Sequence, residues 1–305
     1  MRMAFHVPPD RHGFYGDVVH RFRQLLHKGI ITGIDPIRLN GWLGNFFTDE
    51  DKYLAAHLLS RLTYRADAMV KSSFQHLAHC ELPCVLRAKR VLAFDDLDTF
   101  GRILSEDDAA TPFRFVAVDG TFEKTPGKSG AVVIRAFRRH LNVSKLLLCR
   151  PERLAELPAS VKALIFVDDL VGTGHQFLTF AAHYKLAELT KQRTLVYCPL
   201  LAFKSGLTDL AKNLPWLEIH PVETLDEGHQ FFHPYFKDKT IWGVDEVNTV
   251  QDVRAHVADL CKHNQIPATT RHTLDLVVAF EHAVPNNSVS MLSMKSARWQ
   301  PLFDR

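Results

Sequence analysis

The chain has 305 residues, of which 46% are hydrophobic and 23% are charged, and its formal net charge is +3. This is the composition of an ordinary globular protein, long enough for two domains, and the small net charge gives no indication of nucleic-acid binding. No apolar run approaches the ~18 residues that a transmembrane helix needs. Because no signal peptide is recognisable and the five cysteines are scattered, we expect a cytoplasmic protein with reduced thiols and no membrane contact.

The first part of the chain, residues 1–95, is expected to form a helical region. Apolar residues recur at helical spacing in four segments that begin or end at capping residues, acidic residues, glycine or proline. The predicted helices run from Asp10 to His27, from Asp35 through Phe46, from Thr48 to Leu62, and from Tyr64 to Cys80. The fourth is expected to end before Pro83.

The pattern changes over residues 96–305 to short apolar runs that alternate with helical segments, which is typical of an α/β fold with a parallel sheet. The predicted strands are Phe113 to Val118, Ala163 to Val167, Thr194 to Leu200 and Leu217 to His220, with a last strand from Leu276 to Phe280. The predicted helices are Gly130 to Leu141, His175 to Leu189, Gly206 to Asn213 and Val250 to Cys261.

The most informative segment is a buried strand that leads into two acidic residues and a glycine turn. Asp168 and Asp169 follow the apolar run 163–167, and the turn 172–174 (Gly-Thr-Gly) precedes the helix predicted at His175. Such a turn at a helix N-terminus aims several backbone N–H groups at one phosphate, and adjacent carboxylates suit ribose hydroxyls or a bound magnesium ion. We therefore predict a sugar-phosphate site in which both carboxylates are partly exposed and face one cleft. The alternative is a strand that ends in solvated charge.

This order of features resembles the phosphoribosyl pyrophosphate (PRPP) motif of type I phosphoribosyltransferases. The resemblance implies a type I phosphoribosyltransferase-like parallel sheet flanked by helices, with Mg²⁺ as the metal. It implies that Asp168 and Asp169 hold the ribose and the metal, and that the loop binds the 5-phosphate through Val171, Gly172, Thr173, Gly174, His175 and Gln176. Two positions depart from the motif. Gly172 stands where many members have threonine, and Gln176 stands where a serine or threonine usually helps to bind phosphate.

An earlier loop, residues 120–129, follows another predicted strand and contains Lys128 and Ser129. A P-loop NTPase is the main alternative for this region. A Walker A motif would need a glycine separated from Gly127 by four residues, and Phe122 stands at that position instead. The phosphoribosyltransferase-like interpretation accounts for both loops, because that family also has a pyrophosphate-binding loop after an earlier strand. It implies that Lys128 contacts pyrophosphate and that Ser129 lies at the ligand.

The C-terminal segment carries further motifs. It contains a Pro-Asn-Asn-Ser turn with Asn286 and Asn287, and it ends with Trp299, Phe303 and Arg305. Together with the region around Trp42, it resembles a group of phosphoribosyltransferase-like proteins of bacterial conflict systems, some of them encoded beside retron reverse transcriptases. The resemblance spans residues 35–305 through separated short motifs. It implies a role in anti-phage defence, with a retron reverse transcriptase and its RNA–DNA product among the candidate partners.

Whether the chain is an enzyme is left open by the sequence. Familiar phosphoribosyltransferases have a long flexible loop that closes over the site, whereas only residues 142–162 are available here. We expect the C-terminal segment, with Asn286 and Asn287, to act as the lid, and Trp299 to anchor it. The candidates are a phosphoribosyltransferase, a non-catalytic nucleotide-sensing subunit and a nucleotide-hydrolysing toxin, and a homo-oligomer is not excluded.

Two other groups of residues have the composition of a possible binding site, one for zinc and one for a polyanion. A zinc site is not favoured, because one straight segment cannot wrap a tetrahedral ion and no second ligand pair completes the set; the residues in question are His76, His79, Cys80 and Cys84. The densest basic cluster is interpreted as a solvated helix face in preference to a polyanion-binding surface. It consists of Arg135, Arg138, Arg139, Lys145, Arg150 and Arg153.

Overall fold

The structure of the protein is a computed structural model, which describes residues 5–119, 129–235, 240–269 and 274–304. The chain forms two compact units. Residues 1–67 and 226–305 make unit 1, and residues 68–225 make unit 2. This division differs from the expected boundary after residue 95, because both ends of the chain fold together and the sheet-forming segment lies between them. No helix among the described residues combines the length and the apolar character that a membrane span needs.

Unit 2 is built on a parallel sheet with the strand order β3-β2-β4-β5-β6. Every strand pairing in it is parallel, including that of β7 (Glu223–Leu225) with β5. The strands are β2 (Phe113–Ala117), β3 (Leu148–Cys149), β4 (Ala163–Val171), β5 (Thr194–Phe203) and β6 (Leu217–Ile219). The expected parallel sheet is therefore confirmed. Both central strands are longer than predicted, and β4 runs four residues past Val167.

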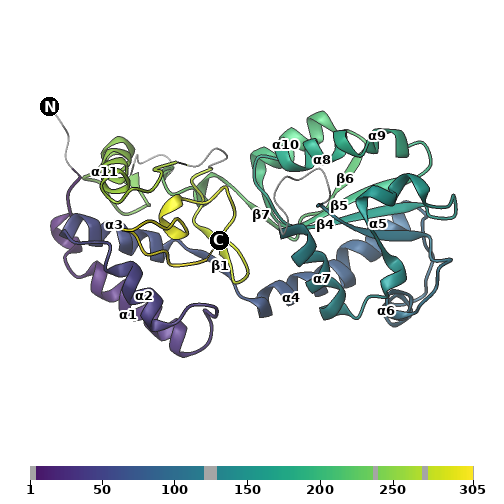
Figure 1. Cartoon of the computed structure of the whole chain (residues 1–305), viewed down its shortest axis with the longest axis horizontal. Helices are drawn as coiled ribbons and strands as arrows, with labels where there is room; N and C mark the ends of the chain where they lie inside the picture. The colour runs from purple at the N-terminus through teal and green to yellow at the C-terminus, as the bar shows by residue number, and fades with distance from the viewer. Residues whose placement is uncertain (1–4, 120–128, 236–239, 270–273, 305) are drawn as a thin grey trace. The chain divides into compact units, whose positions relative to one another are not determined.

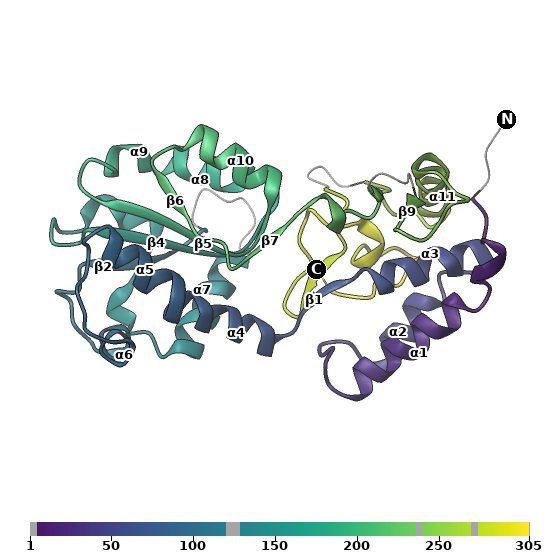
Figure 2. The same ribbon diagram turned by 180° about the vertical axis from the view of Figure 1, so that it is seen from behind.

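Helices cover both faces of this sheet (Figures 1 and 2). Phe115 of β2 packs against Phe137 on one face, with 4.8 Å between ring centroids, and Phe166 of β4 packs against Phe177 on the other at 5.5 Å. Because successive strand residues alternate between faces, each central strand contributes to both cores. The helices of unit 2 are α4 (Asp67–His76), α5 (Leu82–Ala88), α6 (Leu97–Ser105), α7 (Ser129–Leu141), α8 (His175–His183), α9 (Leu186–Leu189) and α10 (Lys204–Asn213).

Two predicted helix boundaries in unit 2 are wrong. The helix expected to stop before Pro83 passes through a π-helical turn, Leu77–Glu81, into α5. Pro83 is the second residue of α5, directly after the π-helical turn, the kind of irregularity at which a helix accommodates proline. The helix expected from His175 to Leu189 is interrupted at Lys185, whose left-handed backbone (φ 50°) separates α8 from α9.

Unit 1 combines the N-terminal helices with the C-terminal segment. Its helices are α1 (Phe14–His27), α2 (Pro36–Leu43), α3 (Asp49–Ser60) and α11 (Val250–His263). Its strands are β1 (Thr63–Arg65), which pairs in parallel with β10 (Val278–Phe280), and the antiparallel pair β8 (Pro234–Tyr235) and β9 (Thr240–Ile241). The helix predicted from Tyr64 therefore starts only at Asp67, because the preceding residues pair with a strand that is more than 200 residues away in sequence.

The two ends of the chain are joined inside unit 1 by a set of buried contacts. The indole nitrogens of Trp42 and Trp299 both donate to the carbonyl of Met291, at 2.9 and 3.2 Å. The Asn45 amide donates to the Gln300 carbonyl at 2.8 Å and accepts from the Gln300 N–H at 3.0 Å. The expected anchoring role of Trp299 is confirmed, since this side chain is 1% exposed.

A buried histidine makes the stability of unit 1 sensitive to pH. The His57 ring stacks on Trp242 at 3.7 Å, and within the described part of the chain its buried Nε2 has no hydrogen-bond partner. Burial holds the pKa of His57 well below its usual value, so the folded state disfavours the charged ring.

We expect the free energy of unfolding to fall as the pH is lowered below ~6.5, the pKa of histidine in an unfolded chain. Below this pH, His57 binds a proton in the unfolded state but stays neutral in the folded state. The free energy of unfolding then falls by up to about 1.4 kcal/mol per pH unit. Urea unfolding at several pH values checks this. His57→Phe keeps a stacked ring and should reduce the pH dependence, whereas His27→Phe, on the exposed end of α1, should leave it unchanged.

Candidate functional site

The two acidic residues lie inside strand β4 and not beyond its end. Asp168 is 2% exposed and Asp169 is 7% exposed, so the expectation that both are partly exposed is wrong. The physical reason is that β4 continues to Val171 and pairs with β5 both before and after Asp169. Two acidic residues in sequence indicated a strand end, but here the chain stays in the sheet and buries them.

Asp168 is held by a tyrosine from the neighbouring strand. The Tyr197 hydroxyl donates to Asp168 Oδ2 at 2.7 Å, and the Asp169 N–H donates to Asp168 Oδ1 at 3.0 Å. Burial, together with the neighbouring carboxylate of Asp169, raises the pKa of Asp168 well above its usual range. Asp169 is the more accessible of the two carboxyl groups, and its Oδ1 accepts the N–H of Leu170 at 2.8 Å.

Behind the acidic pair the chain bends at residues 172–174 and enters α8 at His175, as predicted. Gly174 adopts a left-handed conformation (φ 77°) at the N-cap, and no side chain caps the helix. The Thr173 hydroxyl accepts the N–H of His175 at 3.4 Å. The N–H groups of Gln176 and Phe177 have no hydrogen-bond acceptor among the residues that the structure describes. The start of α8 therefore presents donors of the kind that bind phosphate.

The bend is pressed against the start of α10. A Cβ atom on Gly206 would lie 2.0 Å from the carbonyl oxygen of Gly172 and 3.2 Å from the N atom of Gly174. A Cβ atom on Gly174 would in turn lie 3.1 Å from the Gly206 carbonyl oxygen. Only glycine at position 206 therefore lets α10 support the bend in its observed position.

A similar close approach occurs at the end of β2. A Cβ atom on Gly130, in the first turn of α7, would lie 2.6 Å from the carbonyl oxygen of Val118. β2 and β4 are neighbours in the sheet, so the segment after Val118 starts at the same edge as the bend after β4. Ser129 is the first residue of α7, whereas Lys128 lies outside the described residues.

Asn286 and Asn287 belong to unit 1, where they form the two central positions of a turn. The N–H of Ser288 donates to the Pro285 carbonyl at 3.0 Å, and the Asn287 carbonyl accepts the N–H groups of Leu274 and Leu276. The predicted turn is thus confirmed. The role of its two asparagines at a ligand in unit 2 stays a prediction.

The candidate metal ligands at the end of β4 are the carboxylates of Asp168 and Asp169. No group of three or more histidine, cysteine, aspartate or glutamate side chains that could hold a metal occurs among the described residues, which include His76, His79, Cys80 and Cys84. Mg²⁺ does not need such a group, because it commonly uses one or two carboxylates and takes its other ligands from water and substrate phosphates. Asp169 could supply one such carboxylate, whereas Asp168 would first have to give up its bond to Tyr197. As successive residues of β4, the two point to opposite faces of the sheet, which does not support the expectation that both face one cleft.

Two residues that support this site were not singled out from the sequence. Gly206 could have been identified from the sequence, because it is a glycine in the first turn of a helix that follows a buried strand. Tyr197 could not have been identified in this way. Its hydrogen bond to Asp168 depends on the pairing of two strands, and the two residues are 29 positions apart in the chain.

Known proteins resemble this chain to different extents. No curated protein matches the chain. The solved structures that match include orotate phosphoribosyltransferase from Aeropyrum pernix, at 15% sequence identity and a TM-score of 0.26. That match covers 41% of this chain and 66% of the other, so the chain spans slightly less than two thirds of that protein. The family model designated PRTase-CE matches residues 39–305, which is most of the chain. The chain therefore belongs to the PRTase-CE family, and it has a type I phosphoribosyltransferase-like α/β fold.

Proposed function

We propose that the protein binds PRPP or a nucleotide, together with Mg²⁺, at the end of β4. The observation that carries this proposal is the bend 172–174, which leads into a helix whose N–H groups at Gln176 and Phe177 have no acceptor among the described residues. A phosphate at that position would accept hydrogen bonds from backbone donors and gain from the helix dipole. Membership of a phosphoribosyltransferase-like family supports the same ligand class.

In this proposal the loop Val171–Gln176 holds the 5-phosphate, and Asp168 and Asp169 hold the ribose hydroxyls and the metal. Lys128 and Ser129 contact the pyrophosphate. If the protein is an enzyme, a nitrogen nucleophile displaces pyrophosphate from C1 of the ribose. Bound Mg²⁺ would supply charge neutralisation on the leaving group. The chain's own residues would orient the phosphate and ribose and stabilise charge.

Asp169→Asn should weaken binding of PRPP with Mg²⁺ by roughly 10- to 100-fold, which corresponds to the loss of a hydrogen bond to a charged group. The fold should persist, because asparagine keeps the size of the side chain. Titration calorimetry with and without Mg²⁺ measures the effect, and Asp209→Asn on exposed α10 is the matched control. Equal affinity in both variants would show that the acidic pair does not contact the ligand.

A second candidate, a nucleotide-sensing subunit without catalysis, is favoured by one observation. Asp168 is buried and already bonded to Tyr197, so it must exchange this partner before it can bind a ribose or a metal. Incubation with PRPP and cellular nucleotides, followed by chromatography, separates the candidates. A new phosphoribosylated product formed together with pyrophosphate indicates transfer, loss of nucleotides without such a product indicates a hydrolytic toxin, and binding without turnover indicates a sensor.

We further propose that the protein is an effector or accessory subunit of a bacterial anti-phage defence system of the retron type. The support is the similarity of its motifs to phosphoribosyltransferase-like proteins of conflict systems. A plaque assay on cells that express the gene with its neighbours tests this role. Asp169→Asn should then raise the plaque count, whereas Asp209→Asn should not. Co-purification of a reverse transcriptase with its RNA–DNA product would identify the partner.

A further inference from the structure

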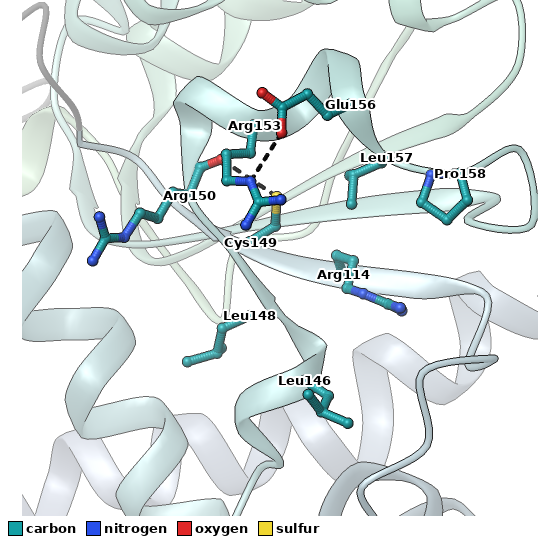
Figure 3. Close-up of a pocket in the computed structure, with 9 residues that line it drawn as sticks. All are labelled: Arg114, Leu146, Leu148, Cys149, Arg150, Arg153, Glu156, Leu157 and Pro158. Carbon is teal, nitrogen blue, oxygen red and sulfur yellow. Dashed lines mark hydrogen bonds and ion pairs between the residues drawn. The ribbon is translucent and has the colours of Figure 1, made fainter.

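A cleft in unit 2 lies at the β3 edge of the sheet. It has a volume of about 370 Å³, within the range of small-molecule sites. It is formed by the start of β2, by β3 and the 3₁₀ turn before it, and by the 3₁₀ segment Pro151–Glu156 with the two residues after it (Figure 3). Its lining residues are Arg114, Leu146, Leu148, Cys149, Arg150, Arg153, Glu156, Leu157 and Pro158.

Arg114 supplies a fixed positive charge to this cleft. It is 6% exposed, and its Nη1 and Nη2 groups donate to the carbonyls of Thr111, Phe113 and Ala109, at 2.5, 2.7 and 2.7 Å. A guanidinium has five N–H donors, so two remain for another acceptor. No ion pair of Arg114 is found within the described ranges. Burial is costly for a cation and lowers the pKa of Arg114, and the nearby Cys149 and Asp108 oppose this effect only in part. A bound anion would relieve that cost.

Two more arginines, Arg150 and Arg153, are among the lining residues of the cleft. In Figure 3 the Arg153 side chain lies over Cys149, whereas that of Arg150 extends away from the other labelled residues. Arg153 pairs with Glu156 at 3.0 Å, but both side chains are more than 60% exposed, so this pair is weak and exchangeable. Arg114 and Arg153 together with the single Glu156 still leave the lining with an excess of positive charge.

The rest of the lining is apolar. Leu146, Leu148, Leu157 and Pro158 give the cleft a hydrophobic surface beside its guanidinium groups. Leu146 is 46% exposed, so its side chain is accessible to a ligand in the cleft. A nucleoside phosphate has the matching chemistry, because its phosphates suit arginine and its base suits an apolar wall.

We propose that this cleft is a second ligand site, which binds the phosphates of a nucleoside phosphate through Arg114 and Arg153 and its base on the leucine and proline residues. The site is separate from the one at the end of β4. Arg114 is the second residue of β2, near the amino end of a parallel strand, whereas Asp168 and Asp169 lie toward the carboxyl end of β4. Binding here therefore does not depend on the function proposed for the acidic pair.

Cys149 provides a local reporter for the experiment. Its thiol lines the cleft, and burial raises its pKa, so alkylation should be measured at alkaline pH. The protein is treated with N-ethylmaleimide at increasing ATP concentrations, and each cysteine is quantified by peptide mass spectrometry. ATP should slow the alkylation of Cys149 and leave Cys80 and Cys84 unchanged, since both of these are exposed on other elements. Inorganic pyrophosphate should protect less well, because it lacks a base.

Two variants separate a ligand site from a merely structural ion pair. Arg153→Ala should raise the ATP concentration needed for protection roughly 10- to 100-fold, by loss of a charged hydrogen bond. Glu156→Ala breaks the same ion pair but frees Arg153, so it should lower that concentration. Asp168→Asn should have no effect on Cys149.

Protection is compared within each variant, because Arg153 itself influences the Cys149 thiol. Absence of protection by ATP would overturn the proposal. So would equal protection by pyrophosphate, or a change in the same direction for both variants.

Discussion

Replacing Gly206 by alanine should remove ligand binding at the β4–α8 bend, with a loss of at least roughly 100-fold in affinity, since a displacement of about 1 Å at a binding site can have that effect. The added methyl group would lie 2.0 Å from the Gly172 carbonyl oxygen, which is backbone and cannot rotate away. Either the bend or α10 must move. The free energy of unfolding should fall by about 1–3 kcal/mol, as for other overpacked sites. Calorimetry with PRPP and urea unfolding measure the two effects.

The matched control is Gly101→Ala in α6. A Cβ atom there meets nothing within 4 Å, so alanine should leave binding intact and stabilise the helix by roughly 0.5–1 kcal/mol. If Gly206→Ala binds the ligand as well as Gly101→Ala does, the bend after β4 is not the phosphate site.

Trp299→Ala should destabilise unit 1 by about 3–5 kcal/mol, the usual cost of removing a fully buried tryptophan. The indole packs edge-on against Phe46 at 5.3 Å between ring centroids and shares the Met291 carbonyl with Trp42. Its loss leaves a cavity where the two ends of the chain meet. Circular dichroism during urea unfolding should show an earlier transition.

Phe47→Ala is the matched control for this loss, because Phe47 is next to Phe46 but is 79% exposed. Its effect should stay within about 0.5 kcal/mol, as for other surface substitutions. A similar midpoint for the two variants would mean that the C-terminal segment is not part of the core of unit 1.

The sequence predicted those parts of the fold that depend on neighbouring residues. The apolar run before Asp168 and the Gly-Thr-Gly turn after Asp169 each specify local structure, so the strand, the bend and the start of α8 were placed correctly. The length of β4 was not predicted correctly, because two acidic residues favour the end of a strand. Only the pairing with β5 keeps this segment in the sheet. The burial of Asp168 depends on Tyr197 in the same way.

The division into units could not be predicted for a related reason. β1 pairs with β10, and Asn45 pairs with Gln300, across more than 200 residues of sequence. Local patterns of hydrophobicity contain no information about such partners. The motifs around Trp42 and Trp299 were recognised, yet their shared function as a structural contact became visible only when both indoles were found on one carbonyl.

The contact between Trp42 and Met291 also sets a time scale for biosynthesis. The two residues are 249 positions apart, with all of unit 2 between them. At ~5–20 residues per second, a ribosome takes on the order of 10 to 50 s to make that stretch. During this interval unit 2 can fold as it leaves the ribosome. The apolar faces of α2 and α3 stay exposed to solvent until the C-terminal segment has been made. We therefore expect chaperones that bind nascent chains to bind these N-terminal helices. We also expect slower translation to promote aggregation through them.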